Sequence, residues 1–209
     1  MIIIYDNFLD NPHEVRNLAL TKEYDKYDKN GKSAIPGYRC MDIHDNIKLE
    51  VLHKIKYLTN NENLLLNDNA ISYQYIPEYY KCGSYHTDIG AGKYTCILYL
   101  TPDAKDNSGT DVCDYDVHER QISHDVWMRW VAIKKQFLKD QSNPEEYDTM
   151  ISEQCNQWHY HAMKIRNKFN RMVIFDSYLL HRAQSFFGKD INDSRLTIVS
   201  FIGQANVFH

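Results

Sequence analysis

The 209-residue sequence is short of cysteine pairs, of long apolar runs and of excess positive charge. Its five cysteines are odd in number and scattered without a CxxC pair, which argues against a disulfide framework and predicts a reducing, cytoplasmic location. The first residues, 1–6, turn polar too soon for a signal peptide, and no apolar run approaches membrane-spanning length. A net charge of −4 gives no electrostatic basis for binding nucleic acid or an anionic membrane.

Internal repeats, low-complexity tracts and flexible linkers are also missing from the sequence. We therefore expect a single domain over residues 1–209, with enough chain for one core. The apolar fraction of 43% and the charged fraction of 25% are ordinary for a soluble globular protein.

Two amphipathic helices are predicted near the N-terminus, over about 12–22 and 45–59, after a short β-branched strand at 2–5. The polar segment between them, 24–39, reads as a loop. From Ala70 the apolar pattern changes to a period of two, which predicts strands at 71–76, 93–101 and 110–112.

Helical patterns return at 121–139 and 145–168, and strand patterns at 171–175 and 195–202. The strands do not alternate regularly with helices, so a βαβ sheet is disfavoured. The predicted class is α+β: a double-stranded β-helix (jelly roll), with N-terminal helices packed on the sheet and a helical insertion at about 113–168. The sequence alone leaves the oligomeric state open.

Two histidines and one aspartate form the first candidate site. His86 and Asp88 are two residues apart, so on an extended chain both side chains leave the same face. Downstream, His181 follows the predicted strand at 171–175 and could complete a set of two imidazoles and one carboxylate. Such a set leaves coordination positions open and is typical of non-heme Fe(II) oxygenases. The simplest alternative is a surface His–Asp pair in a loop.

An arginine in an apolar strand forms the second candidate site. Arg195 and Thr197 lie two apart within the run 195–202, among Leu196, Ile198 and Val199. A guanidinium in such a strand needs an anionic partner, and its planar fork suits bidentate binding of a carboxylate. The hydroxyl of Thr197 could donate one more hydrogen bond to the same oxygens.

The order HxD, distal histidine, Arg-x-Thr resembles the Fe(II)/2-oxoglutarate-dependent dioxygenases, most closely their prolyl-hydroxylase-like branch. The segments 93–100, 108–110 and 170–177 resemble the strands and turn of that branch, with Ser108 where a glycine is usual. The resemblance covers about 70–112 and 169–203, and leaves the insertion at 113–168 uncovered.

The resemblance implies an oxidoreductase with Fe(II) as its metal cofactor and with 2-oxoglutarate and O2 as cosubstrates. Fe(II) would be held by His86, Asp88 and His181. The 5-carboxylate of 2-oxoglutarate would be held by Arg195, Tyr99 and Thr197, with Tyr75 as a further contact. The expected reaction hydroxylates an unactivated C–H bond and releases succinate and CO2. The substrate stays open between a peptidyl proline, an amino acid and another small metabolite.

The sequence alone leaves other interpretations open. A cupin-type metalloenzyme that does not use 2-oxoglutarate would keep the jelly roll but would not need Arg195 and Tyr99. A non-catalytic jelly-roll binding module would be expected to lack at least one of the ligands. His159 and His161, with Cys155 nearby, could be drawn as a zinc site, but two-apart residues diverge on a helix.

Overall fold

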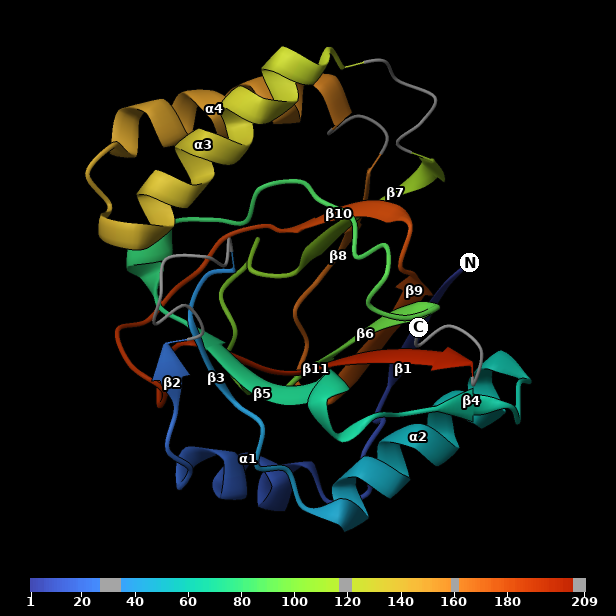
Figure 1. Ribbon diagram of the computed structural model, residues 1–209. Coiled ribbons are helices and arrows are strands. Elements are labelled where there is room, and N and C mark those ends of the chain that lie inside the picture. Colours follow the sequence, from blue (N-terminus) through green and yellow to red (C-terminus); the bar gives the residue numbers. More distant parts are fainter. Residues whose placement is uncertain (27–34, 117–121, 159–161, 205–209) are drawn as a thin grey trace.

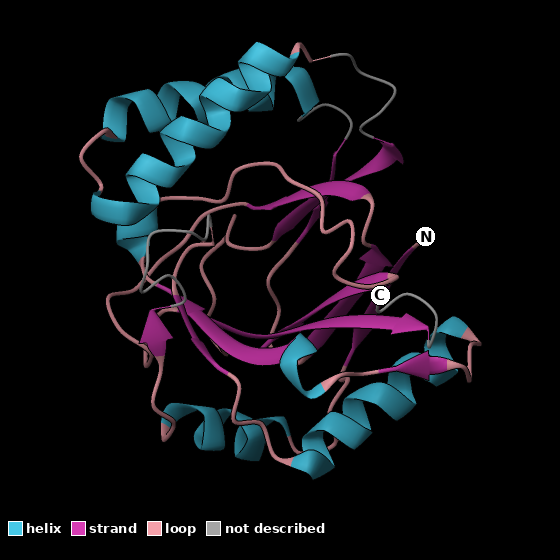
Figure 2. Ribbon diagram, viewed as in Figure 1, coloured by secondary structure: helices cyan, strands magenta, loops and turns pink. Residues whose placement is uncertain are grey.

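Two antiparallel sheets face each other, and helices cover both outer sides. The computed structural model describes residues 1–26, 35–116, 122–158 and 162–204. Helices α1 (Pro12–Leu20) and α2 (Asp45–Thr59) lie under the larger sheet, whereas α3 (His124–Asp140) and α4 (Pro144–Trp158) lie beyond the smaller one (Figure 1). The helices therefore form two separate groups with the strands between them (Figure 2). This arrangement confirms the predicted α+β jelly roll.

Strand partners are distant in sequence, as a jelly roll requires. The larger sheet runs in the order β1 (Ile2–Asp6), β9 (Arg171–Asp176), β6 (Tyr94–Tyr99), β11 (Arg195–Gln204), β5 (Ile71–Ile76), β3 (Tyr38–Cys40), β2 (Asp25–Lys26), and β4 (Leu64–Leu65) pairs with β11. The smaller sheet has the order β10 (Leu179–Ala183), β7 (Thr110–Asp116), β8 (Ala162–Ile165). Two 3-10 turns, Asp68–Ala70 and Glu78–Tyr80, flank β5.

Each central strand of the larger sheet presents one set of side chains to the helices and the alternate set to the smaller sheet. Tyr73 and Ile198, which are register partners, belong to the apolar core shared with Val51 and Ile55 of α2. The alternate set includes Ile97 and Tyr99, which pack against apolar side chains of the smaller sheet. The site described below lies between the sheets, on this second face.

Two expectations about local structure are wrong. The helix expected over 145–168 ends at Trp158, and 162–165 forms β8 because it pairs with the free edge of β7. The expected loop at 24–39 contributes the short strands β2 and β3, because β3 pairs with the open edge of β5. In both cases a sheet edge supplies partners that the local sequence does not reveal.

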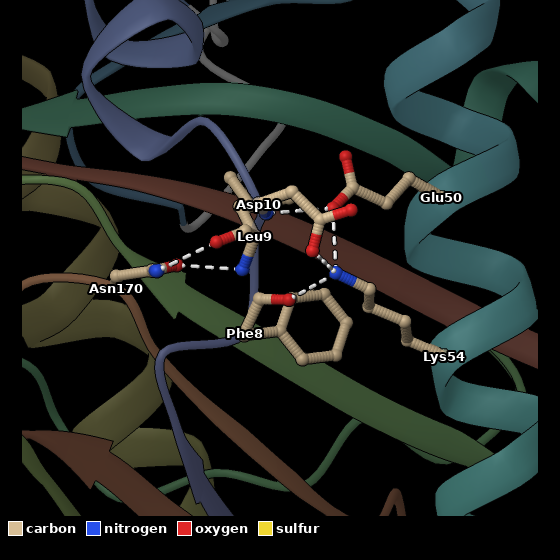
Figure 3. Close-up of polar contacts among 6 residues, drawn as sticks. All are labelled: Phe8, Leu9, Asp10, Glu50, Lys54 and Asn170. Atoms are coloured by element: carbon tan, nitrogen blue, oxygen red, sulfur yellow. Dashed lines mark hydrogen bonds and ion pairs between the residues drawn. The ribbon is translucent and has the colours of Figure 1, made fainter.

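The segment between β1 and α1 is fixed by two polar side chains (Figure 3). The ammonium group of Lys54 donates to the backbone oxygen of Phe8, to Asp10 and to Glu50, each at 2.7 Å. From the other side, the amide of Asn170 donates to the Leu9 oxygen at 3.0 Å and accepts from the Leu9 N–H at 2.8 Å. These contacts attach the first 10 residues to α2 and to the turn before β9.

The edge strand β1 is held by an ion pair as well as by its ladder with β9. Asp6 accepts from Arg171 Nε at 2.6 Å and from Lys168 Nζ at 2.7 Å. Hydrogen bonding to Arg171 outweighs the opposing effect of burial, and with Lys168 it lowers the pKa of Asp6 to about 2.

The five cysteines are all free thiols, and the cytoplasmic location stays a prediction of the sequence. Within the described ranges, no helix has the length and apolar character needed to cross a bilayer.

Candidate metal centre

His86 and His181 are brought together by backbone pairing. The N–H of His86 donates to the His181 oxygen at 3.0 Å, and the N–H of His181 donates to the His86 oxygen at 2.9 Å. This bridge extends the smaller sheet beyond β10. The backbone N–H of Asp88 donates separately to the backbone oxygen of Ser177 at 2.8 Å. The two halves of the predicted ligand set, 95 residues apart in the sequence, therefore meet through backbone hydrogen bonds.

The three side chains converge on one point. One ligand atom from each of His86, Asp88 and His181 lies within 4.8 Å of the other two. His181 Nε2 is 3.1 Å from Asp88 Oδ2, and His86 Nε2 is 3.7 Å from Asp88 Oδ1. The His86 side chain is 41% exposed and that of His181 is 5% exposed, so the cluster opens on one side.

Backbone carbonyls fix the orientation and the tautomer of both imidazoles. His86 Nδ1 lies 2.9 Å from the Ser84 oxygen, and His181 Nδ1 lies 2.9 Å from the Leu179 oxygen. A carbonyl oxygen only accepts, so in each ring Nδ1 carries the proton. In the neutral ring the lone pair is then on Nε2, the atom that faces Asp88.

Asp88 is held as a carboxylate. Its Oδ2 accepts from Thr95 Oγ at 2.8 Å, and Thr95 in turn contacts Ser177 Oγ at 3.1 Å. Burial by itself raises the pKa of Asp88, but His181, His86 and the Thr95 hydroxyl together hold it well below its usual range. Burial and the neighbouring His181 lower the pKa of His86. Neutral imidazoles beside a carboxylate are the protonation states that metal binding requires.

These donors fit a divalent transition metal. Two neutral Nε2 atoms and one carboxylate oxygen are the donor types of the two-histidine, one-carboxylate facial set, which leaves other coordination positions open. The backbone hydrogen bonds at both Nδ1 atoms and the Thr95 hydroxyl are the outer contacts that orient such ligands.

Arg195 lies in the same pocket as the three candidate ligands. The residue is 3% exposed, and it makes no ion pair with any residue that the structure describes. Nε donates to the backbone oxygen of Ser108 at 3.0 Å, and Nη2 donates to Thr110 Oγ at 3.4 Å. The guanidinium lies 5.3 Å from the centre of the Tyr99 ring. Burial lowers the pKa of Arg195, and Tyr99 opposes that effect. A buried cation without a carboxylate is costly, so this geometry fits an anionic ligand.

Tyr99 and Thr197 stand beside Arg195 on the same sheet face. They are register partners across β6 and β11. The Tyr99 hydroxyl is 2.7 Å from Thr110 Oγ, and Thr197 Oγ donates to the backbone oxygen of Gln74 at 3.4 Å. Neither side chain is among the residues that line the pocket.

Tyr75 does not stand with this group, contrary to the expectation from the sequence. It is the register partner of Leu196, whereas Arg195 pairs with Ile76 and Thr197 pairs with Gln74. Opposed residues in antiparallel strands share a face, so Tyr75 points to the helix side. There its ring stacks on Tyr38 at 4.8 Å. The side chain of Gln74 lines the pocket instead.

The helical insertion contributes to the pocket, whose volume is about 140 Å³. Lys134 and Leu138 reach it from α3, and Tyr147 reaches it from α4. Lys134 stands four residues from both Trp130 and Leu138, which are buried, so it lies on the inward stripe of α3. Burial lowers the pKa of Lys134 to about 8, and Asp88 opposes that effect.

Sequence reasoning had not assigned Lys134, Gln74 or Thr95 to the site. The signal for Lys134 was present, since a lysine interrupts an apolar stripe at helical spacing. Gln74 carried a weaker signal, as a polar residue inside the apolar strand 71–76. Thr95 had none, because threonine is ordinary in strands.

The structure describes His124, but not the two histidines of the zinc alternative. His124 is exposed at the start of α3. His159 and His161 lie outside the described residues, so the zinc alternative that pairs them with Cys155 stays a prediction. Among the described residues, His86, Asp88 and His181 form the only group of three or more metal-ligand side chains.

Comparisons with known proteins give one family and a set of distant structures. The family described as "Family of unknown function (DUF6445)" matches residues 70–202. No curated protein matches the sequence.

The similar solved structures share the fold at low identity. HygX from Streptomyces hygroscopicus, solved with nickel, 2-oxoglutarate and hygromycin B bound, has a TM-score of 0.62 at 9% identity, over 98% of this chain and 83% of its own. The non-heme alpha ketoglutarate dependent epimerase SnoN from nogalamycin biosynthesis has a TM-score of 0.57 at 12% identity, over 98% and 78%. A prolyl 4-hydroxylase from Phytophthora capsici has a TM-score of 0.51 at 15% identity, over 99% and 60%.

Proposed function

The chain belongs to the family of unknown function DUF6445 and has the fold of the Fe(II)/2-oxoglutarate-dependent dioxygenases, and we propose that it is an enzyme of that kind. In this proposal residues 1–209 act as one domain and hydroxylate an unactivated C–H bond of a small-molecule or peptide substrate. The insertion at about 113–168 covers one side of the pocket.

His86, Asp88 and His181 would hold the iron through Nε2, a carboxylate oxygen and Nε2. Bound iron would supply oxidative chemistry in which O2, 2-oxoglutarate and a C–H bond give CO2, succinate carrying one oxygen atom, and a hydroxylated product carrying the other. The chain itself fixes the donors. The Ser84 and Leu179 carbonyls hold each Nδ1 proton, and the Thr95 hydroxyl supports the ionised carboxylate.

Arg195 would anchor the 5-carboxylate of 2-oxoglutarate. Arg195 Nε donates its hydrogen to the Ser108 carbonyl, and Nη2 donates one of its two hydrogens to the Thr110 hydroxyl. Both hydrogens of Nη1 and the second hydrogen of Nη2 are left to bind a ligand. Gly109, between those two residues, has no room for a side chain, because an added Cβ would lie 1.8 Å from the Ile165 oxygen. Tyr99 and Thr197 would support the anchor through Thr110 and the strand pairing.

A single observation carries this proposal: a buried guanidinium, with no carboxylate partner among the described residues, lines the same pocket as a convergent His–Asp–His cluster. A metalloenzyme that does not use 2-oxoglutarate would have no need for Arg195. A surface His–Asp pair would not have its second histidine buried beside it.

The direct test measures succinate formation from 2-oxoglutarate with Fe(II) under air. Uncoupled turnover without the substrate is expected for the wild type and should be lost in His181→Ala. His124→Ala is the matched control, because that histidine is exposed and lies outside the candidate centre. Equal succinate yields from the wild type and His181→Ala would contradict the proposal.

A further inference from the structure

Lys134 is a cation in the pocket that the proposed reaction does not use. It lies on the insertion helix α3 and lines the pocket together with His86 and Asp88. It makes no hydrogen bond and no ion pair with any described residue. It also lines a second, smaller hollow together with His86 and Trp130. Lys134 therefore lines the space beside the candidate metal ligands, and the residues that the structure describes give it no ion pair.

The position of Lys134 argues against a solvated surface lysine. Its neighbours one helical turn away on either side are Trp130, 4% exposed, and Leu138, 6% exposed. By contrast Lys135, the next residue, is exposed to solvent. A lysine on a buried stripe loses hydration, and a bound anion compensates for that loss.

The charges in the pocket leave Lys134 unmatched even after the proposed ligands bind. A divalent metal would be neutralised by Asp88 and by the 1-carboxylate of 2-oxoglutarate, and Arg195 by the 5-carboxylate. Asp88 is the only carboxylate among the described residues that line the pocket. Arg39 also lines the pocket, but it has an interaction partner of its own. The positive charge on Lys134 then remains, and a substrate with a single negative charge matches it.

The apolar walls of the pocket indicate the rest of the ligand. Leu138 and Tyr147 from the insertion, Phe186 from the chain after β10 and Ile76 from β5 line the same pocket. They offer apolar surface, whereas a compact, strongly hydrated anion such as inorganic phosphate needs several polar partners. A carboxylate on an apolar body suits one ammonium group beside such walls.

We propose that Lys134 binds the carboxylate of the substrate, and that this substrate is a monocarboxylate with an apolar body. The assignment rests on the proposed function, since it places the substrate beside a loaded metal centre. It makes the helical insertion a determinant of specificity as well as a cover for the pocket.

The experiment uses the full chain loaded with Ni(II) and saturating 2-oxoglutarate, so that neither the metal position nor Arg195 is free for the probe. The probes are 5,5,5-trifluoropentanoate and its amide, which differ mainly in the negative charge. Fluorine NMR relaxation is compared between Ni(II)-loaded and Zn(II)-loaded protein, because only a probe bound near the paramagnetic ion relaxes faster with Ni(II).

The wild type should bind the acid at least tenfold more tightly than the amide, as expected for a charge-assisted hydrogen bond. Lys134→Met keeps the length and apolar stem of the side chain and should abolish this preference. Lys134→Arg should retain most of it. Lys135→Met is the matched control on the exposed face of the same helix and should behave as the wild type.

Two results with the probes would overturn the assignment, and calorimetry can give a third. One is an equal response to acid and amide in the wild type, including no response to either. The other is an unchanged acid preference in Lys134→Met. Calorimetry on the same samples measures Ni(II) and 2-oxoglutarate binding. If the wild type binds neither, the proposed function fails. If Lys134→Met loses 2-oxoglutarate affinity along with the acid preference, the lysine belongs to the cosubstrate site and the substrate assignment fails alone.

Discussion

Removing the guanidinium of Arg195 should weaken 2-oxoglutarate binding far more than metal binding. Two of its donor positions are already occupied, by Ser108 at 3.0 Å and Thr110 at 3.4 Å. A carboxylate can therefore accept two further hydrogen bonds from Arg195. Each charge-assisted bond contributes about 1.5–3 kcal/mol, so Arg195→Met should lose roughly 3 kcal/mol or more, about a hundredfold in Kd.

Calorimetry with Ni(II) in place of iron measures the two affinities separately, in wild type, Arg195→Met and Arg195→Lys. Lysine keeps the charge but loses the planar fork, so its defect should be intermediate, about tenfold. Thermal unfolding gives an independent readout. 2-Oxoglutarate at one hundred times the wild-type Kd should stabilise the wild type by about 2.7 kcal/mol and Arg195→Met by less than 1 kcal/mol.

The control for this prediction is the unliganded protein. Arg195→Met leaves the Ser108 carbonyl without its donor, but it also removes a buried charge that has no carboxylate partner in the described part of the chain. The two effects oppose each other, so the unfolding free energy of the unliganded protein should change by no more than about 2 kcal/mol. A parallel loss of Ni(II) and 2-oxoglutarate affinity would refute the reasoning and mark Arg195 as a structural residue.

Four further outcomes follow from the contacts. Thr95→Val removes the hydroxyl bond to the metal-facing carboxylate and should weaken Ni(II) binding about tenfold by calorimetry. Tyr99→Phe should weaken 2-oxoglutarate binding about tenfold, whereas Tyr75→Phe, on the other face of the sheet, should not. Asn170→Ala removes both buried bonds to the segment before α1, and its positive φ of 59° disfavours alanine, so urea unfolding should show a loss of about 2–4 kcal/mol. Asp6→Asn should cost about 1 kcal/mol above pH 4, after allowance for solvent screening, and progressively less as pH falls from about 4 to 2.

The sign of the Asp6 prediction follows from its lowered pKa. The folded protein keeps Asp6 ionised down to about pH 2, whereas the unfolded chain takes up the proton near 3.8. The ion pair therefore stabilises the fold above the unfolded pKa, and the stabilisation disappears as pH falls through the folded one. A gap between wild type and Asp6→Asn that widens towards pH 2 would contradict the assignment. For the tyrosine pair, a Tyr75→Phe defect equal to that of Tyr99→Phe would contradict the sheet register.

Much of the scaffold could be predicted because its signals are local. The period of two at 71–76 and 195–202 and the helical stripe at 45–59 each follow from which residues must be buried. The HxD spacing likewise put His86 and Asp88 on one side of an extended chain. These features can be predicted from residues that are close together in the sequence.

The sequence by itself determined which side chains of a strand share a face and which possible metal ligands are present. It did not determine whether a given face would point to the pocket or to the helices. Tyr75 and Gln74 are adjacent in one strand, and only the register of β5 against β11 turns Gln74 to the pocket and Tyr75 to the helices. The strand β8 formed because the edge of β7 offered it hydrogen bonds. Lys134 reached the centre because α3 packs over the smaller sheet. Each outcome depends on contacts between residues far apart in the chain, and local preference carries no information about those.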